Sequence, residues 1–298
     1  MFIEIRKQGK KKKYYLVHSY RVGDKIKRIS RYLGSNLSEK GLEKLRKRAE
    51  EIILKQIKSQ NPFEFELSQG EIKFYKNFEK NIKIEHFQVD WKKFTKDFTY
   101  NTNAIEGSTV KYPEVKALLD NQESPENPDE LETICVANAV QYLKNLKEKK
   151  LSIELVKKLH CLCFNKTKHF AGELRNVEVV IRDESGYIVH QGAPSKDVLN
   201  LLNELVKWYN KHLRKNPTLL IAALLHNQFE EIHPFQDGNG RIGRLLLNFV
   251  LITNNYPPIN IMLKDRQRYY WTLRIFDKTG NIKPTLRFLI SQYKKQYG

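Results

Sequence analysis

The feature that most constrains this chain is a short polar segment, residues 233–244, which lies between two helix-patterned stretches. Residues 219–232 before it and residues 245–252 after it are rich in leucine and isoleucine. Pro234 disfavours the α conformation for the residue that precedes it, so the first helix should end at His233 with the imidazole at its tip. The pattern predicts two helices joined by a turn that begins with a histidine.

The turn has the composition of an anion-binding site. Gly238 and Gly240 have no Cβ, so the backbone N–H groups of residues 238–240 can converge on an anion, and the positive end of the next helix adds its own free N–H groups. Arg241 and Arg244 lie three apart, on one face of that helix, and can grip further phosphates bidentately. The alternative is a surface loop with solvated arginines, but so many of these residue types within twelve positions favour a phosphate site.

Two further side chains of the turn can do chemistry on a bound phosphate. Asp237 can hold Mg²⁺ that bridges phosphate oxygens. His233, near neutral at pH 7, is the natural general base. No Gly-Lys-Ser/Thr follows the glycines, so the segment is not a P-loop.

The segment His-Pro-Phe-Gln-Asp-Gly-Asn-Gly-Arg-Ile-Gly-Arg resembles the signature of the Fic (filamentation induced by cAMP) family, His-Pro-Phe-x-Asp/Glu-Gly-Asn-Gly-Arg-x-x-Arg, and fills each fixed position. The typical member is a protein adenylyltransferase that moves AMP from ATP to a Ser, Thr or Tyr hydroxyl. The resemblance implies that His233 deprotonates that hydroxyl and that Asp237 coordinates Mg²⁺ at the α- and β-phosphates. It implies phosphate contacts for five residues: Gly238, Asn239, Gly240, Arg241 at the β-phosphate and Arg244 at the γ-phosphate.

The chemistry of AMP transfer agrees with these residue types. In-line attack at the α-phosphorus, with pyrophosphate leaving, needs positioning, neutralised charge and one proton acceptor. The Doc-type kinase branch of the family carries lysine where this chain has Gly240, so the resemblance favours AMP transfer over phosphorylation.

Residues 102–107, Thr-Asn-Ala-Ile-Glu-Gly, resemble the inhibitory-helix pattern Ser/Thr-x-x-x-Glu-Gly/Asn of the Fic class with an N-terminal inhibitor. The resemblance implies that Glu106 pairs with Arg244 and blocks productive seating of the γ-phosphate. A carboxylate at the last turn of a helix can satisfy an arginine that ATP would otherwise occupy. Gly107 in the C′ position is expected to stop this helix, and the alternative to the inhibitory role is that Glu106 belongs to an ordinary exposed helix end.

Strand-like runs at 177–181 and 187–190 flank the turn residues 183–186 and predict a β-hairpin. It stands where the Fic family has its flap, after Gly172-x-x-Arg175, and Ile181 is the nucleotide-contact candidate on it. A target segment is expected to add alongside a flap strand, backbone to backbone. The usual second proline is absent before Pro194, and the alternative is a hairpin that only covers the core.

The resemblance extends over about residues 95–295. It places Tyr269 and Tyr270 near the adenine, where a ring face could stack the base, although tyrosines at helical spacing also occur as plain core residues. Asp277 occupies a position where relatives often have an adenine-contacting asparagine. ATP as substrate and Mg²⁺ as cofactor are the expected ligands.

The remainder of the chain is predicted to be mainly α-helical, as a Fic-type helical bundle with a β-hairpin flap behind a small antiparallel β-module. Runs at 2–5, 14–17 and 26–32 predict the small sheet, followed by a charged helix over 38–59. The expected domains are residues 1–60 and residues 61–298. Helices of the second domain are expected at 90–106, 113–120, 129–147, 152–164, 195–213, 217–232, 240–254, 265–276 and 283–296.

The positive charge of the chain is concentrated at its N-terminus. The chain carries 53 Lys and Arg against 34 Asp and Glu, a net charge of +19. Residues 1–60 hold 18 basic and 6 acidic residues, so +12 of that excess lies there. Such a field attracts phosphate backbones or acidic partners, and solvated lysine-rich faces are the equally weighted alternative.

The sequence argues against a membrane-spanning, a secreted and a disulfide-stapled protein. It has no apolar run of about 18 residues, and its first residues lack the apolar core of a secretory signal. Three cysteines cannot form a paired disulfide framework, which fits a reducing cytoplasm. His160-Cys-Leu-Cys163 is not expected to bind metal, because the two cysteines point about 200° apart on a helix. His226 is expected to be a core histidine.

These observations predict an ATP- and Mg²⁺-dependent protein adenylyltransferase, cytoplasmic, held down by Glu106 and acting on a hydroxyl of a target protein or of itself. The same site could reverse the reaction, with Glu106 aligning a water that releases AMP. A nucleic-acid-associated regulator that uses the basic N-terminal module is the second hypothesis, and transfer of UMP or phosphocholine is a third. The sequence leaves open whether the chain forms a homodimer.

Overall fold

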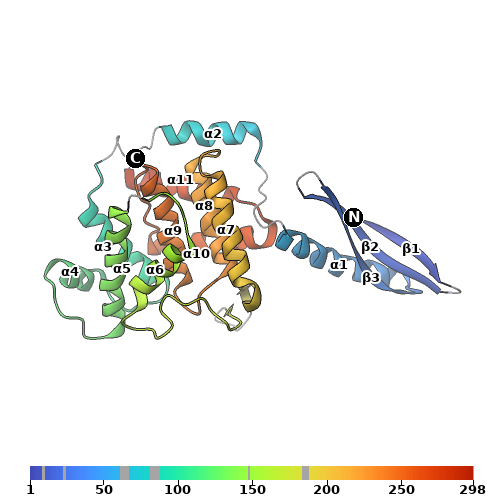
Figure 1. Cartoon of the computed structure of the whole chain (residues 1–298), viewed down its shortest axis with the longest axis horizontal. Coiled ribbons are helices and arrows are strands. Elements are labelled where there is room, and N and C mark those ends of the chain that lie inside the picture. The colour runs from blue at the N-terminus through green and yellow to red at the C-terminus, as the bar shows by residue number, and fades with distance from the viewer. Residues whose placement is uncertain are drawn as a thin grey trace. The chain divides into compact units, whose positions relative to one another are not determined.

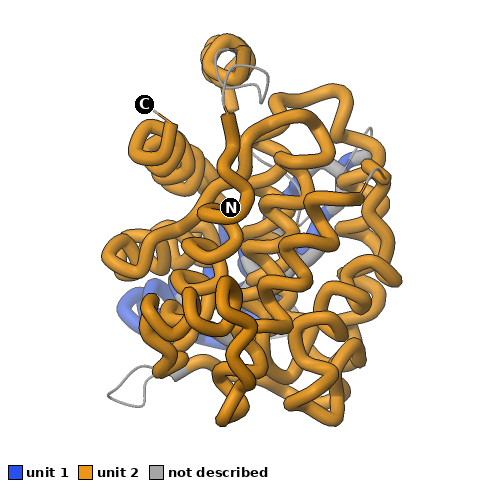
Figure 2. The backbone as a smooth tube through the Cα atoms, turned by 90° about the vertical axis from the view of Figure 1, so that its left-hand side faces the viewer, with its two compact units in different colours: residues 1–64 blue, residues 65–298 orange. Residues whose placement is uncertain are grey.

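The computed structural model describes residues 1–8, 11–22, 25–60, 67–80, 88–146, 148–182 and 188–297. The chain divides into two compact units, residues 1–64 and residues 65–298, drawn in two colours in Figure 2.

The first unit is a three-stranded antiparallel sheet followed by one helix. The strands β1 (Phe2–Gln8), β2 (Lys11–Val22) and β3 (Lys25–Ser35) are ordered β1-β2-β3, and the helix α1 spans Glu39–Gln60. Alternating side chains place one sheet face against α1, around the buried residues Leu16, Leu33, Ala49 and Ile53. The predicted sheet and the predicted helix over 38–59 are confirmed.

The second unit is mainly helical. Its helices are α2 (Gln69–Lys80), α3 (Trp91–Ile105), α4 (Tyr112–Asp120), α5 (Pro128–Asn145), α6 (Ile153–Phe164), α7 (Val198–His212), α8 (Thr218–Ile232), α9 (Asn239–Thr253), α10 (Arg266–Thr279) and α11 (Lys283–Tyr297). Short 3₁₀ turns at Ser195–Asp197 and Leu263–Asp265 lead into α7 and α10. Each helix expected from the sequence is present within a few residues of its predicted bounds. Among the described residues, no helix combines the length and apolarity that crossing a bilayer requires.

Helices α8 and α9 form the centre of this unit (Figure 1). All residues of α8 from Leu219 to Phe229 are buried, as are most residues of α9. Both helices are therefore buried on every side, although each also carries buried polar residues, such as His226 on α8 and Arg244 on α9. Helices α7, α10 and α11 pack against α8, and α3, α5 and α6 pack against α9. The turn between the two central helices is therefore surrounded by rigid elements.

A two-stranded hairpin, β4 (Val180–Arg182) and β5 (Ile188–Gln191), lies beside that turn. The hairpin was predicted, but its first strand begins at Val180 and not at 177. The reason is that the carbonyl of Val177 has another partner, since Nη1 of Arg175 donates to it at 2.7 Å. The predicted turn at 183–186 lies outside the described residues.

Candidate active site

His233 ends helix α8. Its backbone is left-handed, with φ at 53°, and its N–H donates to the carbonyl of Phe229 at 2.9 Å. Arg175, only 5% exposed, holds the helix end, since its Nε donates to the carbonyl of His233 at 2.6 Å and its Nη2 to that of Ile232 at 3.2 Å. A buried guanidinium thus satisfies carbonyls that a helix C-terminus leaves without partners. The imidazole stands at the helix tip, as Pro234 predicts.

The environment of His233 sets its protonation state. The side chain is buried, and burial lowers its pKa to about 4, with the neighbouring His190 and Arg175 adding to the lowering. Nδ1 lies 3.3 Å from the carbonyl oxygen of Glu230. A carbonyl can only accept, so the proton of the neutral ring sits on Nδ1 and Nε2 keeps its lone pair. At pH 7 His233 is therefore a proton acceptor, the state that a general base requires.

The turn after His233 is braced by side chains from inside and outside it. The amide of Asn239 accepts from the N–H of Phe235 and donates to its carbonyl, both at 2.8 Å. His160 accepts from the N–H of Gly172 at 2.8 Å and its other nitrogen donates to the carbonyl of Asp237 at 3.1 Å. The side chain of Asn239 thus braces the turn, and the phosphate contact predicted for this residue falls to its backbone N–H.

Two glycines allow the close approaches at the start of α9. Gly238 has φ +79°, and a Cβ there would lie 2.4 Å from the ring of Phe164. A Cβ on Gly240 would lie 2.2 Å from Oε1 of Glu106. The first N–H groups of α9 have no acceptor within the helix, and the helix dipole is positive at this end. The carboxylate of Glu106 thus lies beside the proposed anion cradle.

Arg244 is tied to helix α3. Its side chain is 2% exposed, its Nη2 lies 2.7 Å from Oε1 of Glu106, and its Nε donates to the hydroxyl of Thr102 at 2.7 Å. Nη2 also donates to the carbonyl of Thr102 at 3.0 Å. Although burial opposes the charge of Arg244, the Glu106 carboxylate raises the pKa of Arg244 above its usual range. The pair that the resemblance implies, Glu106 with Arg244, is present.

Glu106 stands at the C-terminal end of α3 because the helix stops there. Gly107 has φ +97°, and its N–H donates to the carbonyl of Ala104 at 3.1 Å. The carbonyl of Asn103 accepts from both Glu106 N–H at 3.0 Å and Ser108 N–H at 3.1 Å. This left-handed glycine closes the helix, as the sequence predicted.

Arg241 points elsewhere, toward α5 and α6, although the sequence places it on one helix face with Arg244. Its Nη1 donates to the carboxylate of Glu132, and its guanidinium lies 4.3 Å from the ring centre of Phe164. The side chains of Arg241 and Glu132 are each 8% exposed. Thr167 donates its hydroxyl to the same carboxylate at 2.9 Å. Glu132 was not predicted from the sequence. The feature that could have revealed it is an acidic residue on an otherwise apolar face of the helix.

Asp237 offers a half-exposed carboxylate. Oδ1 accepts from the N–H of Gly238 at 2.6 Å, and Oδ2 lies 3.3 Å from Nζ of Lys168 and 3.8 Å from Nη2 of Arg241. Burial raises its pKa, but Arg241, the Gly238 N–H and Lys168 together leave the pKa below its usual value. In the part of the chain that the structure describes, no three His, Cys, Asp or Glu side chains form a metal cage. One ionised carboxylate beside a phosphate cradle fits Mg²⁺, which is commonly bound by one or two carboxylates and substrate phosphates.

The two tyrosines of α10 have different surroundings. Tyr269 is 1% exposed, its hydroxyl lies 2.8 Å from Nε2 of His226, and the two rings stack. Tyr270 is partly exposed and donates its hydroxyl to the carbonyl of Ile105 at 3.2 Å. Tyr270 is therefore better placed than Tyr269 to offer a ring face to a base, and it also touches the helix that carries Glu106. His226 is a core histidine, as predicted.

The hairpin brings further residues to the site. His190 of β5 pairs with Ile181 of β4, its ring centre lies 5.5 Å from that of His233, and its Nδ1 is 3.9 Å from the carboxylate of Asp277. Ile181 is 42% exposed. The predicted adenine-side residue Asp277 thus reaches the hairpin, while Ile181 remains available for contact.

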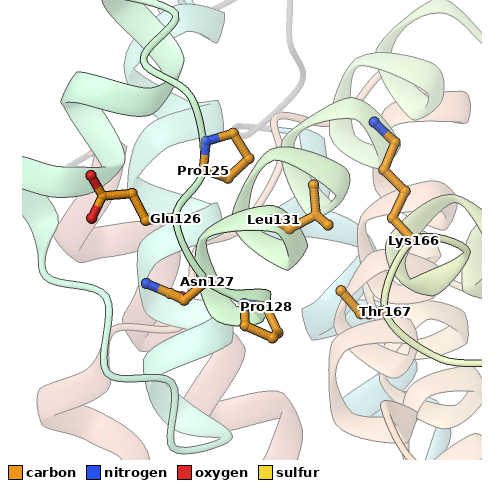
Figure 3. Close-up of a pocket in the computed structure, with 7 residues that line it drawn as sticks. All are labelled: Pro125, Glu126, Asn127, Pro128, Leu131, Lys166 and Thr167. Atoms are coloured by element: carbon orange, nitrogen blue, oxygen red, sulfur yellow. The ribbon is translucent and has the colours of Figure 1, made fainter.

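The cysteines and one shallow surface pocket lie apart from this chemistry. Cys135, Cys161 and Cys163 are free, with Cys161 partly exposed and the other two buried. A shallow pocket of about 380 Å³, drawn in Figure 3, is lined by the loop before α5, the first turn of α5 and the loop after α6: Pro125, Glu126, Asn127, Pro128, Leu131, Lys166 and Thr167. It contains none of the residues of the turn.

Sequence comparison relates this architecture to known proteins. Residues 150–251 match the Fic/DOC family. The chain is 29% identical to a protein adenylyltransferase Fic of Nematostella vectensis over 201 residues, which are 64% of this chain and 45% of that protein. It is 28% identical to the protein adenylyltransferase Fic of Drosophila melanogaster over 197 residues, 64% of this chain and 39% of that protein. The chain thus spans less than half the length of these relatives.

Solved structures share the fold. A Fic domain containing signalling protein from Bacteroides thetaiotaomicron has a TM-score of 0.63 and 29% identity, covering 68% of this chain and 84% of that one. C. elegans Fic-1 has a TM-score of 0.63 with 21% identity, covering 87% of this chain and 75% of that one, a likeness of fold alone. The mainly helical fold expected from the sequence is confirmed.

Proposed function

We propose that this chain, a Fic/DOC family protein related to the protein adenylyltransferases Fic, transfers AMP from ATP to a side-chain hydroxyl of a protein. The observation that carries the proposal is the buried imidazole of His233 at the end of α8, in the short turn that leads to the glycine-rich start of α9. A proton acceptor beside an anion cradle is the arrangement that nucleotidyl transfer needs.

The bond changes assign a role to each group. The hydroxyl oxygen of the target attacks the α-phosphorus of ATP, the bond to the β-phosphate breaks, and pyrophosphate leaves. The hydroxyl proton passes to Nε2 of His233. The N–H groups of Gly240 and its neighbours donate to phosphate oxygens, and Arg244, once Glu106 has left it, neutralises the leaving group. Arg241, whose Nη1 is held by Glu132, would reach the phosphates only through its remaining N–H groups. Mg²⁺, which Asp237 would hold, would supply further neutralisation of the phosphates.

We propose that Glu106 inhibits AMP transfer. Its carboxylate lies 2.7 Å from Nη2 of Arg244 and 2.2 Å from where a Cβ of Gly240 would be, so it adds negative charge at the helix end that should receive the triphosphate. An ATP γ-phosphate that needs Arg244 must displace it. The reverse reaction, in which Glu106 orients a water that releases AMP, uses the same position.

The substrate of the transfer is proposed as a protein segment, including one of this chain itself. The partly exposed strand β4 offers an edge to which an extended segment can add through its backbone. The hydroxyl of that segment would then approach His233 from the hairpin side, since His190 of β5 adjoins His233.

Intact-mass and peptide mass spectrometry test the proposal. The Glu106→Gly protein is incubated with ATP and Mg²⁺, alone and with cell lysate, and in parallel with UTP or CDP-choline. We expect one or more adenylyl groups on serine, threonine or tyrosine, absent when His233→Ala is added. If an adduct formed from UTP or CDP-choline but not from ATP, the chain would transfer UMP or phosphocholine and not AMP.

A further inference from the structure

The sheet of the first unit has one covered face and one open face. Helix α1 packs against the side that carries Ile3, Tyr14 and Leu16. Because side chains alternate along a strand, Glu4, Tyr15 and their neighbours point to the other side. The register aligns Glu4, Tyr15 and Tyr32 in one row across the three strands. No element of this unit is seen packing on that side in the described residues.

The open face is made of arginines and aromatic rings that contact one another. Arg6 lies 4.3 Å from the ring centre of Tyr15, and Tyr15 packs on Tyr32 at 5.2 Å. Arg28 lies 5.9 Å from the ring centre of Phe2. The side chains of Arg6 and Arg28 are 49% and 56% exposed. These contacts fix the direction of two guanidinium groups that still face solvent.

Most of the charge excess of the unit lies in the sheet segment, +9 against +3 in the helix. Residues 1–38 contain eleven Lys and Arg against two acidic residues, Glu4 and Asp24, whereas residues 39–60 contain seven against four. Asp24 lies outside the described residues. Glu4 contacts both arginines of the open face, at 2.9 Å from Arg6 and closely from Arg28. A sheet with this positive charge is complementary to a polyanion.

The shape of the sheet favours one polyanion. Strand β1 pairs with residues 11–17 of β2, so the part of β2 from His18 to Val22 pairs with β3 alone and forms a two-stranded ribbon. The major groove of B-DNA admits such a ribbon. Arg28, opposite Ser19, lies on the ribbon, whereas Arg6 and Tyr32 lie on the adjoining three-stranded part, where they would meet the phosphates that flank the groove. Single-stranded RNA binds instead by stacking its bases on free ring faces, and Arg6 already covers one face of Tyr15.

We propose that the open face of this sheet, with Arg6, Arg28 and Tyr32, binds duplex DNA, with the arginines on phosphates and Glu4 as a restraint on both. This function is independent of AMP transfer at His233. Because the arginines contact phosphates and not bases in this arrangement, binding depends steeply on salt.

Fluorescence anisotropy with a labelled duplex of about 20 base pairs, titrated with the full chain at about 50 and 200 mM salt, tests this. We expect the double variant Arg6→Gln with Arg28→Gln to lose about two phosphate contacts. The fourfold rise in salt should then reduce its affinity by a factor about tenfold smaller than the factor for the wild-type chain. Lys44→Gln with Lys47→Gln removes the same charge from exposed positions of α1 and should leave binding close to wild type.

Glu4→Gln should tighten DNA binding, because it releases both arginines from their carboxylate partner. A misfolded sheet could only weaken binding, so this variant distinguishes an effect on DNA contact from an effect on folding. No binding of the wild-type chain at low salt, weaker binding of Glu4→Gln, or an equal loss from the α1 variant would overturn the proposal. Tighter binding of a single-stranded RNA of the same length would also overturn it and assign the face to RNA.

Discussion

Glu106 and Arg244, 138 residues apart in the chain, join the end of helix α3 to the first turns of α9 through one contact of 2.7 Å. The guanidinium is 2% exposed and the carboxylate 29% exposed. The arginine is therefore a fixed part of the core, while the carboxylate can leave without unfolding it. A ligand with a phosphate group could take the place of the carboxylate on this arginine.

Glu106→Gly should raise incorporation of labelled AMP into the chain itself. A hydrogen bond to a charged group contributes about 1.5–3 kcal/mol, so removing this competitor should raise the rate by about 10- to 100-fold at limiting ATP. Scintillation counting of the chain after reaction with labelled ATP and Mg²⁺ measures it. Glu123→Gly, in the exposed loop before α5, is the matched control and should match wild type. Equal labelling in all three proteins would reject an inhibitory Glu106.

His233→Ala in the Glu106→Gly background should lower AMP transfer by about 10²- to 10⁴-fold, the usual contribution of one general base. ATP should still bind, because the phosphate contacts come from α9. Labelling gives the rate, and calorimetric titration with ATP gives the affinity. Transfer at an undiminished rate would show that His233 is not the base.

The pH dependence of transfer follows from the lowered pKa of His233. With a pKa of about 4, the imidazole is neutral from pH 8 down to about pH 5 and gains its proton only below that. The rate of Glu106→Gly should therefore stay level between about pH 8 and 5.5. A histidine with the ordinary pKa of 6.5 would already lose half of its activity at pH 6.5. Initial rates at saturating ATP distinguish the two profiles.

The buried pair of Glu132 and Arg241 should be important for stability. Glu132→Ala leaves Arg241, whose side chain is 8% exposed, with only the more distant carboxylate of Asp237 at 3.8 Å, which should cost about 3 kcal/mol of unfolding free energy, the low end for a broken buried pair. Urea unfolding followed by circular dichroism measures it, with Glu173→Ala, an exposed site, as the control. A loss below about 1 kcal/mol would show that water reaches Arg241 in solution.

Local signals predicted much of this site. Pro234 placed the end of α8, and Gly107 placed the end of α3, because each acts on the backbone of its immediate neighbours. The partners that come from distant helices were not predictable in this way. Glu132 meets Arg241 from 109 residues away, and Arg175 meets His233 from 58 residues away, through packing that sequence periodicity does not specify.

Gly238 and Gly280 provide a matched pair that isolates the contact between the turn and α6. Both are left-handed, with φ +79° and +71°, so alanine at either site should cost about 1–2 kcal/mol for the backbone alone. A Cβ at 280 meets nothing within 4 Å, whereas at 238 it would lie 2.4 Å from the ring of Phe164. That ring lies under Arg241, so it cannot move without disturbing the arginine. Gly238→Ala should therefore cost about 1–3 kcal/mol more than Gly280→Ala in urea unfolding, and equal costs would mean that Phe164 yields freely.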